Sequence, residues 1–315
     1  MSPRFSDRTR RIDGDSPRTM VWTAVLFVAM KRSLPVLVLL LALALPAQAA
    51  AGERKFYVSL GDSYAAGFQP QMSLAGWRKN GFANQLVPLA RRRGHDFELV
   101  NFACGGETTA SFLTRRGSCG SGPRYRSTQA RAATRFLRRN RGEVGLVTVS
   151  LGGNDVLSCA GAGVADPVAC VAEAVQQVGR NLRRIVRRLR EAAGRRVRIV
   201  GITYPDVVLA RWLTGQQADQ DFARLSIVGF RDFINPTLRA AYRSARGRFV
   251  DVTAATGAYG PLEETTTLEP YGVIPKPVAE VCRLTHMCAR GDIHARTRGY
   301  RVIAELIAAT LPRRR

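Results

Sequence analysis

Short apolar segments alternate with amphipathic segments along most of the chain. Five apolar runs have the length and composition of buried strands: Lys55–Leu60, Phe97–Ala103, Gly145–Leu151, Val197–Ile202 and Phe249–Val252. Helical spacing of apolar residues predicts helices over Phe82–Arg93, Thr128–Arg139, Pro167–Ala193, Phe222–Ser244 with a break near Pro236, and Thr297–Ala309. This alternation predicts an α/β domain whose central parallel sheet is covered by helices on both faces.

The first 49 residues have a different character. Residues 30–33 (MKRS) are basic, residues 34–46 are apolar and residues 47–49 (AQA) are small, which together resemble a secretory signal. The apolar run is shorter than the roughly 20 residues that a membrane-spanning helix needs. We therefore predict a leader over residues 1–49, cleaved after Ala49 or alternatively after Ala51, and a single domain over residues 50–315. Translation from Met30 is the simpler explanation of residues 1–29, and a longer leader or a membrane-retained end is the alternative.

The composition is that of a globular, strongly basic protein. The 315 residues include 48 Lys and Arg against 24 Asp and Glu, and 46% are hydrophobic. These values exclude a disordered chain, a collagen-like repeat and a protein with several membrane spans. Without residues 1–49 the net charge is still +20, because that segment holds only seven basic and three acidic residues. The arginines are scattered and no nucleic-acid-binding motif accompanies them, so we expect no nucleic-acid partner and at most a weak attraction to anionic envelope surfaces.

Six cysteines form an even set, as expected of disulfides in an exported chain. Their proximity in sequence suggests three local pairs: Cys104–Cys119, Cys159–Cys170 and Cys282–Cys288. An alternative is a metal site, because Cys282, His286, Cys288 and His294 lie within 13 residues. Their spacing fits no common zinc pattern, and we expect neither a metal nor a cofactor.

Four short blocks of chemically distinctive residues follow predicted strands or precede the last helix. They are Gly61-Asp62-Ser63 after the first strand, Cys104-Gly105-Gly106-Glu107 after the second, Gly152-Gly153-Asn154-Asp155 after the third, and Gly291-Asp292-Ile293-His294. In parallel α/β sheets, binding and catalytic sites lie at the carboxyl ends of the strands. These blocks are therefore the best candidates for a functional site.

The four blocks, in this order, resemble those of the SGNH (GDSL) hydrolase family, and the resemblance spans about residues 55–305. It implies a three-layer α/β/α, flavodoxin-like fold and a serine esterase or lipase that uses neither metal nor cofactor. The stretch Asn101–Thr109, with its cysteine, is similar to exported actinobacterial lipase and esterase members. That similarity favours acyl lipids or short acyl esters as substrates.

A serine hydroxyl is a poor nucleophile unless a base removes its proton. Ser63 follows a strand, where a sharp turn exposes a side chain, and the chain has three histidines to serve it. His95 lies in a charged stretch that we expect to be a surface turn, and His286 lies inside the expected 282–288 disulfide loop. Both elimination and the family resemblance point to His294 as the base.

The resemblance also implies the remaining site residues. Three donors would stabilise the oxyanion: the backbone N–H groups of Ser63 and Gly106 and the side-chain amide of Asn154. The family's commonest spacing places the acid that orients the base at residue 291, which is Gly in this chain. Asp292 is the candidate acid, with a Ser-His dyad as the alternative. Ala295 replaces the usual proline, which changes the local turn only.

Other polar and aromatic residues receive structural roles. We expect Asp62 and Asp155 to fix turns, and we expect Trp212, Tyr204 and Phe230 to be core residues rather than substrate contacts. The sequence thus predicts a secreted esterase or lipase whose substrate is an acyl ester. The alternatives are a carbohydrate O-deacetylase of the same fold and a non-catalytic, basic envelope-binding protein, although the latter should have lost one of the four block residues. Acyl length, alcohol and oligomeric state are not specified.

Overall fold

The computed structural model describes residues 54–115, 127–160 and 164–314. Contacts divide the chain into residues 1–50 and residues 51–315, and the second unit contains every described element. Five strands form its central sheet: β1 (Lys55–Gly61), β2 (Phe97–Asn101), β3 (Val144–Ser150), β4 (Arg198–Ile202) and β5 (Arg248–Val250). The sheet has the order β2-β1-β3-β4-β5 and all its neighbouring strands are parallel. The predicted fold class is confirmed, and the predicted strands agree with the observed ones to within three residues at each end.

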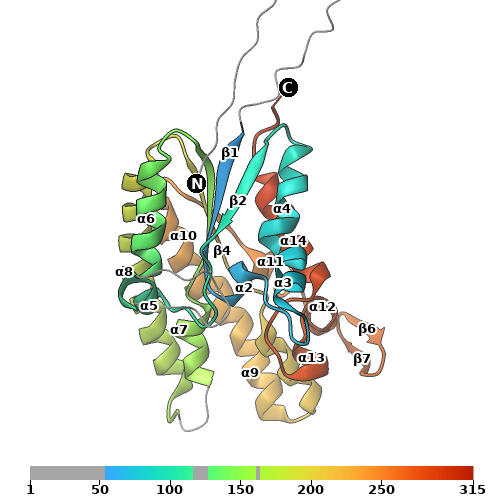
Figure 1. Ribbon diagram of the computed structural model, residues 1–315. Helices are drawn as coiled ribbons and strands as arrows, with labels where there is room; N and C mark the ends of the chain where they lie inside the picture. The colour runs from blue at the N-terminus through green and yellow to red at the C-terminus, as the bar shows by residue number, and fades with distance from the viewer. Residues whose placement is uncertain (1–53, 116–126, 161–163, 315) are drawn as a thin grey trace, which may run out of the picture. The chain divides into compact units, whose positions relative to one another are not determined.

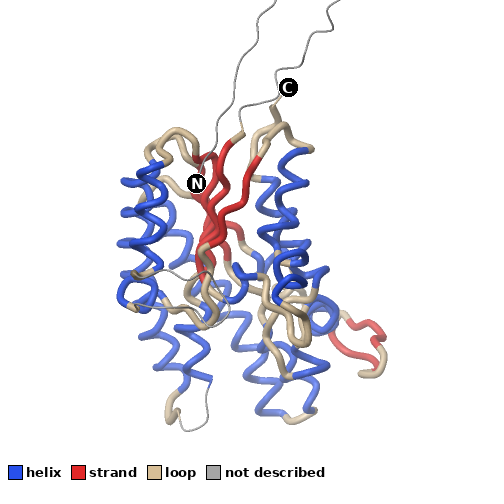
Figure 2. The backbone as a smooth tube through the Cα atoms, in the orientation of Figure 1, coloured by secondary structure: helices blue, strands red, loops and turns tan. Residues whose placement is uncertain are grey.

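Helices cover both faces of the sheet, as Figures 1 and 2 show. On one face, α6 (Gln129–Arg139), α8 (Pro167–Ala193) and α10 (Asn235–Arg243) bury side chains such as Leu137, Leu182 and Leu238 against the strands. On the other face, α4 (Phe82–Arg91) and α14 (Thr297–Ala309) pack Leu86 and Ile303 against Tyr57 and Leu146. The three-layer arrangement therefore follows from strands that are apolar on both sides.

The long helix α8 shows how local sequence sets these elements. Asp166 caps its first turn by accepting a hydrogen bond from the Ala169 N–H at 2.9 Å, and Pro167 occupies the start, where its missing N–H costs nothing. Gly194, with φ of +88°, ends it. Among the described residues, no helix has both the length and the apolar character that crossing a bilayer requires.

Several elements were not predicted. They are α3 (Leu74–Asn80), the 3₁₀ helix η2 (Val207–Thr214), α12 (Lys276–Leu284), α13 (Met287–Arg290), the hairpin of β6 (Thr265–Leu268) and β7 (Gly272–Pro275), and the short helices α2 (Ser63–Ala66), α5 (Thr109–Thr114), α7 (Gly153–Leu157), η1 (Ser158–Ala160) and α11 (Val252–Ala255). The segment predicted as one interrupted helix is α9 (Gln217–Val228), the π-helix η3 (Gly229–Ile234) and α10, so the irregularity lies just before Pro236. A third core cluster joins η2, α12 and β7 beside the main sheet.

The expectation for His95 was wrong. Its side chain is buried, with Nε2 2.7 Å from the Pro312 carbonyl oxygen and its ring stacked on Phe97. The surrounding arginines are charged, but the end of the chain folds back over this turn: the Arg314 N–H donates to the Arg93 carbonyl. His95 is therefore a structural residue, remote from the four blocks.

Candidate active site

Three of the four blocks meet because they follow three neighbouring strands, β2, β1 and β3. Ser63 begins α2 directly after β1, the Gly106 turn follows β2, and Asn154 lies in α7 after β3. Gly61 is required at the end of β1: its φ is +131°, and a Cβ there would lie 2.0 Å from the Ser150 carbonyl oxygen. This close approach of β1 to β3 brings Ser63 toward Asn154.

A relay of hydrogen bonds links the serine to the fourth block. Ser63 Oγ lies 2.7 Å from His294 Nε2, and His294 Nδ1 lies 2.8 Å from Asp292 Oδ1. The same Asp292 oxygen accepts the backbone N–H of His294 at 2.9 Å. The structure thus brings together the predicted nucleophile, base and acid, including the acid at the unusual two-residue spacing.

His294 is enclosed by aromatic rings. The ring of Phe68 lies 4.4 Å from the imidazole, centre to centre, and that of Tyr64 lies 5.7 Å away. Burial lowers the pKa of His294 below its ordinary value, although Asp292 acts in the opposite direction. The imidazole is therefore neutral around pH 7 and can accept a proton from Ser63.

Ser63 and Asn154, two of the residues predicted to supply oxyanion donors, line the same cavity. Asn154 Nδ2 donates to the Glu107 carbonyl oxygen at 2.9 Å, which fixes the amide beside the turn that contains Gly106. Gly106 has φ of +70°, and a Cβ there would meet no atom within 4 Å, so the turn is open to a ligand. Asp155 stabilises the segment after this turn by accepting the Thr109 N–H at 2.9 Å and the Thr109 hydroxyl at 2.6 Å.

Asp62 serves as a buried support behind the serine. It caps α2 by accepting the Tyr64 N–H at 3.0 Å, and it also accepts the hydroxyls of Ser150 at 3.2 Å and Tyr204 at 2.5 Å. Burial raises its pKa to about 7, while these hydrogen bonds lower it. The expected turn-fixing roles of Asp62 and Asp155 agree with these contacts.

Sequence reasoning missed several supporting residues. Tyr64 donates its hydroxyl to the Ile293 carbonyl at 2.6 Å and so ties the serine turn to the histidine segment. Gln129 binds the backbone of Gly61 through both ends of its amide, at 2.7 and 3.0 Å, and donates to the buried Glu107 at 2.9 Å. Glu107 belongs to the block after the second predicted strand, so its position was a signal, whereas Gln129 lies in an ordinary helical stretch.

Two of the three predicted disulfides lie within the described residues, and both are present: Cys159–Cys170 and Cys282–Cys288. The pair Cys104–Cys119 was also predicted, but Cys119 lies outside the described residues. The Cys282–Cys288 bond leaves neither sulfur as a thiolate, which rules out the alternative metal site there.

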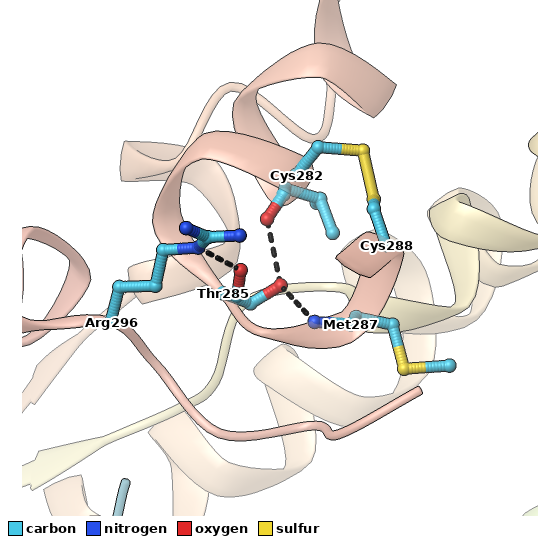
Figure 3. The surroundings of a disulfide bond; sticks show 6 residues. Cys282, Thr285, Met287, Cys288 and Arg296 are labelled. Atoms are coloured by element: carbon cyan, nitrogen blue, oxygen red, sulfur yellow. Dashed lines mark hydrogen bonds between the residues drawn. A yellow bond between two sulfur atoms is a disulfide. The ribbon is translucent and has the colours of Figure 1, made fainter. Parts of the chain in front are cut away.

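The Cys282–Cys288 loop contacts Arg296, two residues after the predicted base His294, and Figure 3 shows the disulfide with Thr285 and Arg296. Thr285, inside the loop, donates its hydroxyl to the Val281 carbonyl at 2.7 Å and accepts Arg296 Nε on its own carbonyl at 2.7 Å. Thr285 also forms a β-bridge with Ala295, and the His286 N–H donates to the His294 carbonyl at 2.9 Å. The disulfide loop is therefore a backbone support for residues 294–296.

An apolar cavity of about 140 Å³ opens beside Ser63 and Asn154. Tyr204 and Phe230, expected to be core residues rather than substrate contacts, both line this cavity, and Tyr204 also packs against the core. Trp212 packs against the third core cluster and beneath the Arg224 guanidinium, as a structural residue would.

Comparison with known proteins places this chain in a family. The model of the GDSL-like lipase/acylhydrolase family matches residues 59–302. The chain belongs to this family. As a member of this family, the chain is a carboxylic ester hydrolase. The matched residues include all four blocks found in the sequence. No curated protein matches the chain.

The chain is similar to several solved structures. The extracellular lipase from Streptomyces rimosus superposes with a TM-score of 0.50 at 15% identity, covering 82% of this chain and all of that one. An arylesterase from Agrobacterium tumefaciens gives 0.42 at 16% identity, covering 81% and 97%. An acetyl xylan esterase from Geobacillus stearothermophilus gives 0.44 at 15%, covering 83% and 97%. The S. rimosus likeness supports the three-layer fold of this GDSL-like hydrolase.

Proposed function

We propose that this chain is a secreted serine esterase or lipase in which Ser63 is the nucleophile, His294 the general base and Asp292 the orienting acid. The observation that carries the proposal is the relay in which His294 contacts Ser63 Oγ through Nε2 and Asp292 through Nδ1, at 2.7 and 2.8 Å. Contact with both partners fixes the imidazole in the orientation that general-base catalysis needs.

The reaction follows from this arrangement. His294 Nε2 takes the Ser63 proton as Oγ attacks the ester carbonyl, and Asp292 stabilises the resulting imidazolium. The oxyanion is held by the N–H groups of Ser63 and Gly106 and by the Asn154 amide. His294 then protonates the departing alcohol, and the same base activates the water that hydrolyses the acyl-enzyme. Because Asp292 contacts His294 directly, a triad is favoured over a Ser-His dyad.

Secretion is supported by two observations. The disulfides Cys159–Cys170 and Cys282–Cys288 are of a kind that persists in oxidising compartments. The likeness to the S. rimosus lipase, which is described as extracellular, agrees with export. The predicted leader over residues 1–49 lies outside the described residues. The weak attraction to anionic envelope surfaces and the lack of a nucleic-acid partner remain predictions from the charge pattern.

The direct test uses the Ser63→Ala variant. We expect the purified protein to hydrolyse p-nitrophenyl acetate and Ser63→Ala to lose at least about 10³-fold in kcat/KM, because Ser63 Oγ is the acyl acceptor of the proposed mechanism. A reactive organophosphonate ester should label wild type stoichiometrically, and peptide mass mapping should place the adduct on Ser63. Equal activity in both proteins, or an adduct elsewhere, would contradict the proposal.

A further inference from the structure

The apolar cavity beside Ser63 is built from elements that lie far apart in the sequence. Its wall combines α8, η2, η3 and α10, with side chains that include Val171, Val175, Val178, Val208, Phe230 and Leu238. Ser63 and Asn154, the predicted nucleophile and oxyanion donor, stand at its edge. A molecule in this cavity therefore reaches the reacting carbonyl.

The chemistry of the wall selects an apolar occupant. No Lys, Arg or His is among the described residues that line the cavity. Of its polar side chains, Asp62 and Tyr204 are already hydrogen-bonded to each other, and Thr237 stands beside Leu238. Sugar rings need many hydrogen-bonding partners, because each buried hydroxyl without one is costly. The wall offers few, whereas a hydrocarbon chain needs none.

The position of His294 decides which half of the ester enters. His294 must reach the leaving oxygen to protonate it. Neither His294 nor Phe68, which packs on its ring, lines the cavity. The departing alcohol therefore lies on the His294 side of Ser63, and the half of the ester left for the cavity is the acyl group.

We propose that this cavity is an acyl-chain site and that the enzyme is selective for medium and long acyl esters over acetyl esters. The inference rests on the proposed Ser63 mechanism. Each methylene moved from water into an apolar wall favours binding by roughly fourfold. We expect kcat/KM to rise at least about tenfold from acetyl to octanoyl p-nitrophenyl esters, measured below their aggregation concentrations.

Two substrate series separate the acyl half from the alcohol half. The first varies the acyl group of p-nitrophenyl esters from acetyl to decanoyl, and the second varies the alcohol of acetate esters from ethyl to octyl. The proposal expects a steep dependence on acyl length and a shallow one on alcohol length. A steep alcohol series with a flat acyl series would overturn it. So would a best substrate of acetyl chain length.

Variants of the wall test the residues themselves. Val175→Phe places a ring in the cavity, and we expect the decanoyl-to-acetyl ratio of kcat/KM to fall at least about tenfold. Phe230→Ala enlarges the cavity and should move the optimal acyl length to longer chains. This second variant does not depend on a phenylalanine ring fitting at the buried Val175 position. The control is the same valine-to-phenylalanine change at Val273, which is 71% exposed on β7 and should leave the ratio unaltered.

The outcomes distinguish this inference from the proposed function. Hydrolysis that Ser63→Ala abolishes, combined with a chain-length ratio that neither wall variant changes, would overturn the acyl-chain site and leave the serine mechanism intact. Failure to hydrolyse any ester would overturn both. Circular dichroism on each variant confirms that the protein compared is folded.

Discussion

Tyr204 donates its hydroxyl to Asp62 Oδ2 at 2.5 Å, directly behind the turn that presents Ser63. Burial raises the pKa of Asp62 to about 7, far above its ordinary value near 3.8. Folding therefore favours the protonated carboxyl. The resulting stabilisation is complete below the pKa of the unfolded chain and is lost as the pH rises to about 7.

The first prediction concerns stability against pH. Between about pH 4 and 7, the contribution of Asp62 to the free energy of unfolding should fall by on the order of 4 kcal/mol. The difference between wild type and Asp62→Asn in chemical denaturation at several pH values isolates this term, since other groups cancel. Tyr204→Phe removes a hydrogen bond that lowers the pKa of Asp62. In that variant the pH-dependent loss of stability should therefore extend above pH 7. A difference that does not change with pH would contradict this account.

The second prediction concerns the pH dependence of activity. Burial lowers the pKa of His294, and only the neutral imidazole accepts the serine proton, so kcat/KM should reach half its maximum below pH 6.5. Asp292→Asn removes the carboxylate that raises this pKa. We expect its acidic limb to shift to still lower pH and kcat to fall by roughly 10²–10⁴-fold. A pH-rate profile of both proteins on one soluble ester is the measurement. Full activity in Asp292→Asn would favour a dyad.

The third prediction concerns the oxyanion. Asn154→Ala removes one donor and should lower kcat by roughly 10²–10³-fold, with a small change in KM. The control is Asn140→Ala at the end of α6, whose side-chain amide donates to the Phe136 carbonyl at 2.9 Å, away from the site. If Asn154→Ala mainly raises KM, the amide binds the substrate rather than the transition state.

The fourth prediction concerns the Cys282–Cys288 loop. Thr285 and His286, inside the loop, contact residues 294–296 through a β-bridge, a backbone hydrogen bond and the Arg296 side chain. Opening the disulfide should therefore loosen the segment that holds His294 and lower kcat more than it raises KM. The double variant Cys282→Ser, Cys288→Ser is compared with wild type well below its melting temperature. Unchanged kcat in a folded variant would show that the hydrogen bonds alone hold the segment.

Much of this architecture could be predicted from the sequence because it depends on local pattern. The strands of the sheet are uninterrupted apolar runs, and the site blocks follow them at the edge where parallel strands end. His95 shows the limit: its charged neighbours indicate exposure, but the segment 311–314, more than 200 residues later, covers it. Burial of a side chain by residues distant in sequence cannot be predicted from the local pattern of apolar and polar positions.

The cavity and the acid illustrate the same division. Phe230 and Val175 lie 55 residues apart on η3 and α8, and nothing in either stretch indicates that they line one wall. In the sequence, the two-residue spacing of Asp292 from His294 left a Ser-His dyad open as the alternative. In the structure, the backbone between them turns so that one carboxylate oxygen reaches both the ring and the N–H of His294. Such a turn depends on exact dihedral angles that residue types alone do not reveal.

The double contact of Asp292 has a consequence for how this enzyme could fail or be tuned. Asp292 and His294 are neighbours on one short segment and therefore move together. The 282–288 loop positions this segment next to Ser63. A shift of this segment changes the distance from His294 to Ser63 but keeps the hydrogen bond between His294 and Asp292. The contacts between the 282–288 loop and this segment, rather than the geometry between Asp292 and His294, therefore set how closely the imidazole approaches Ser63.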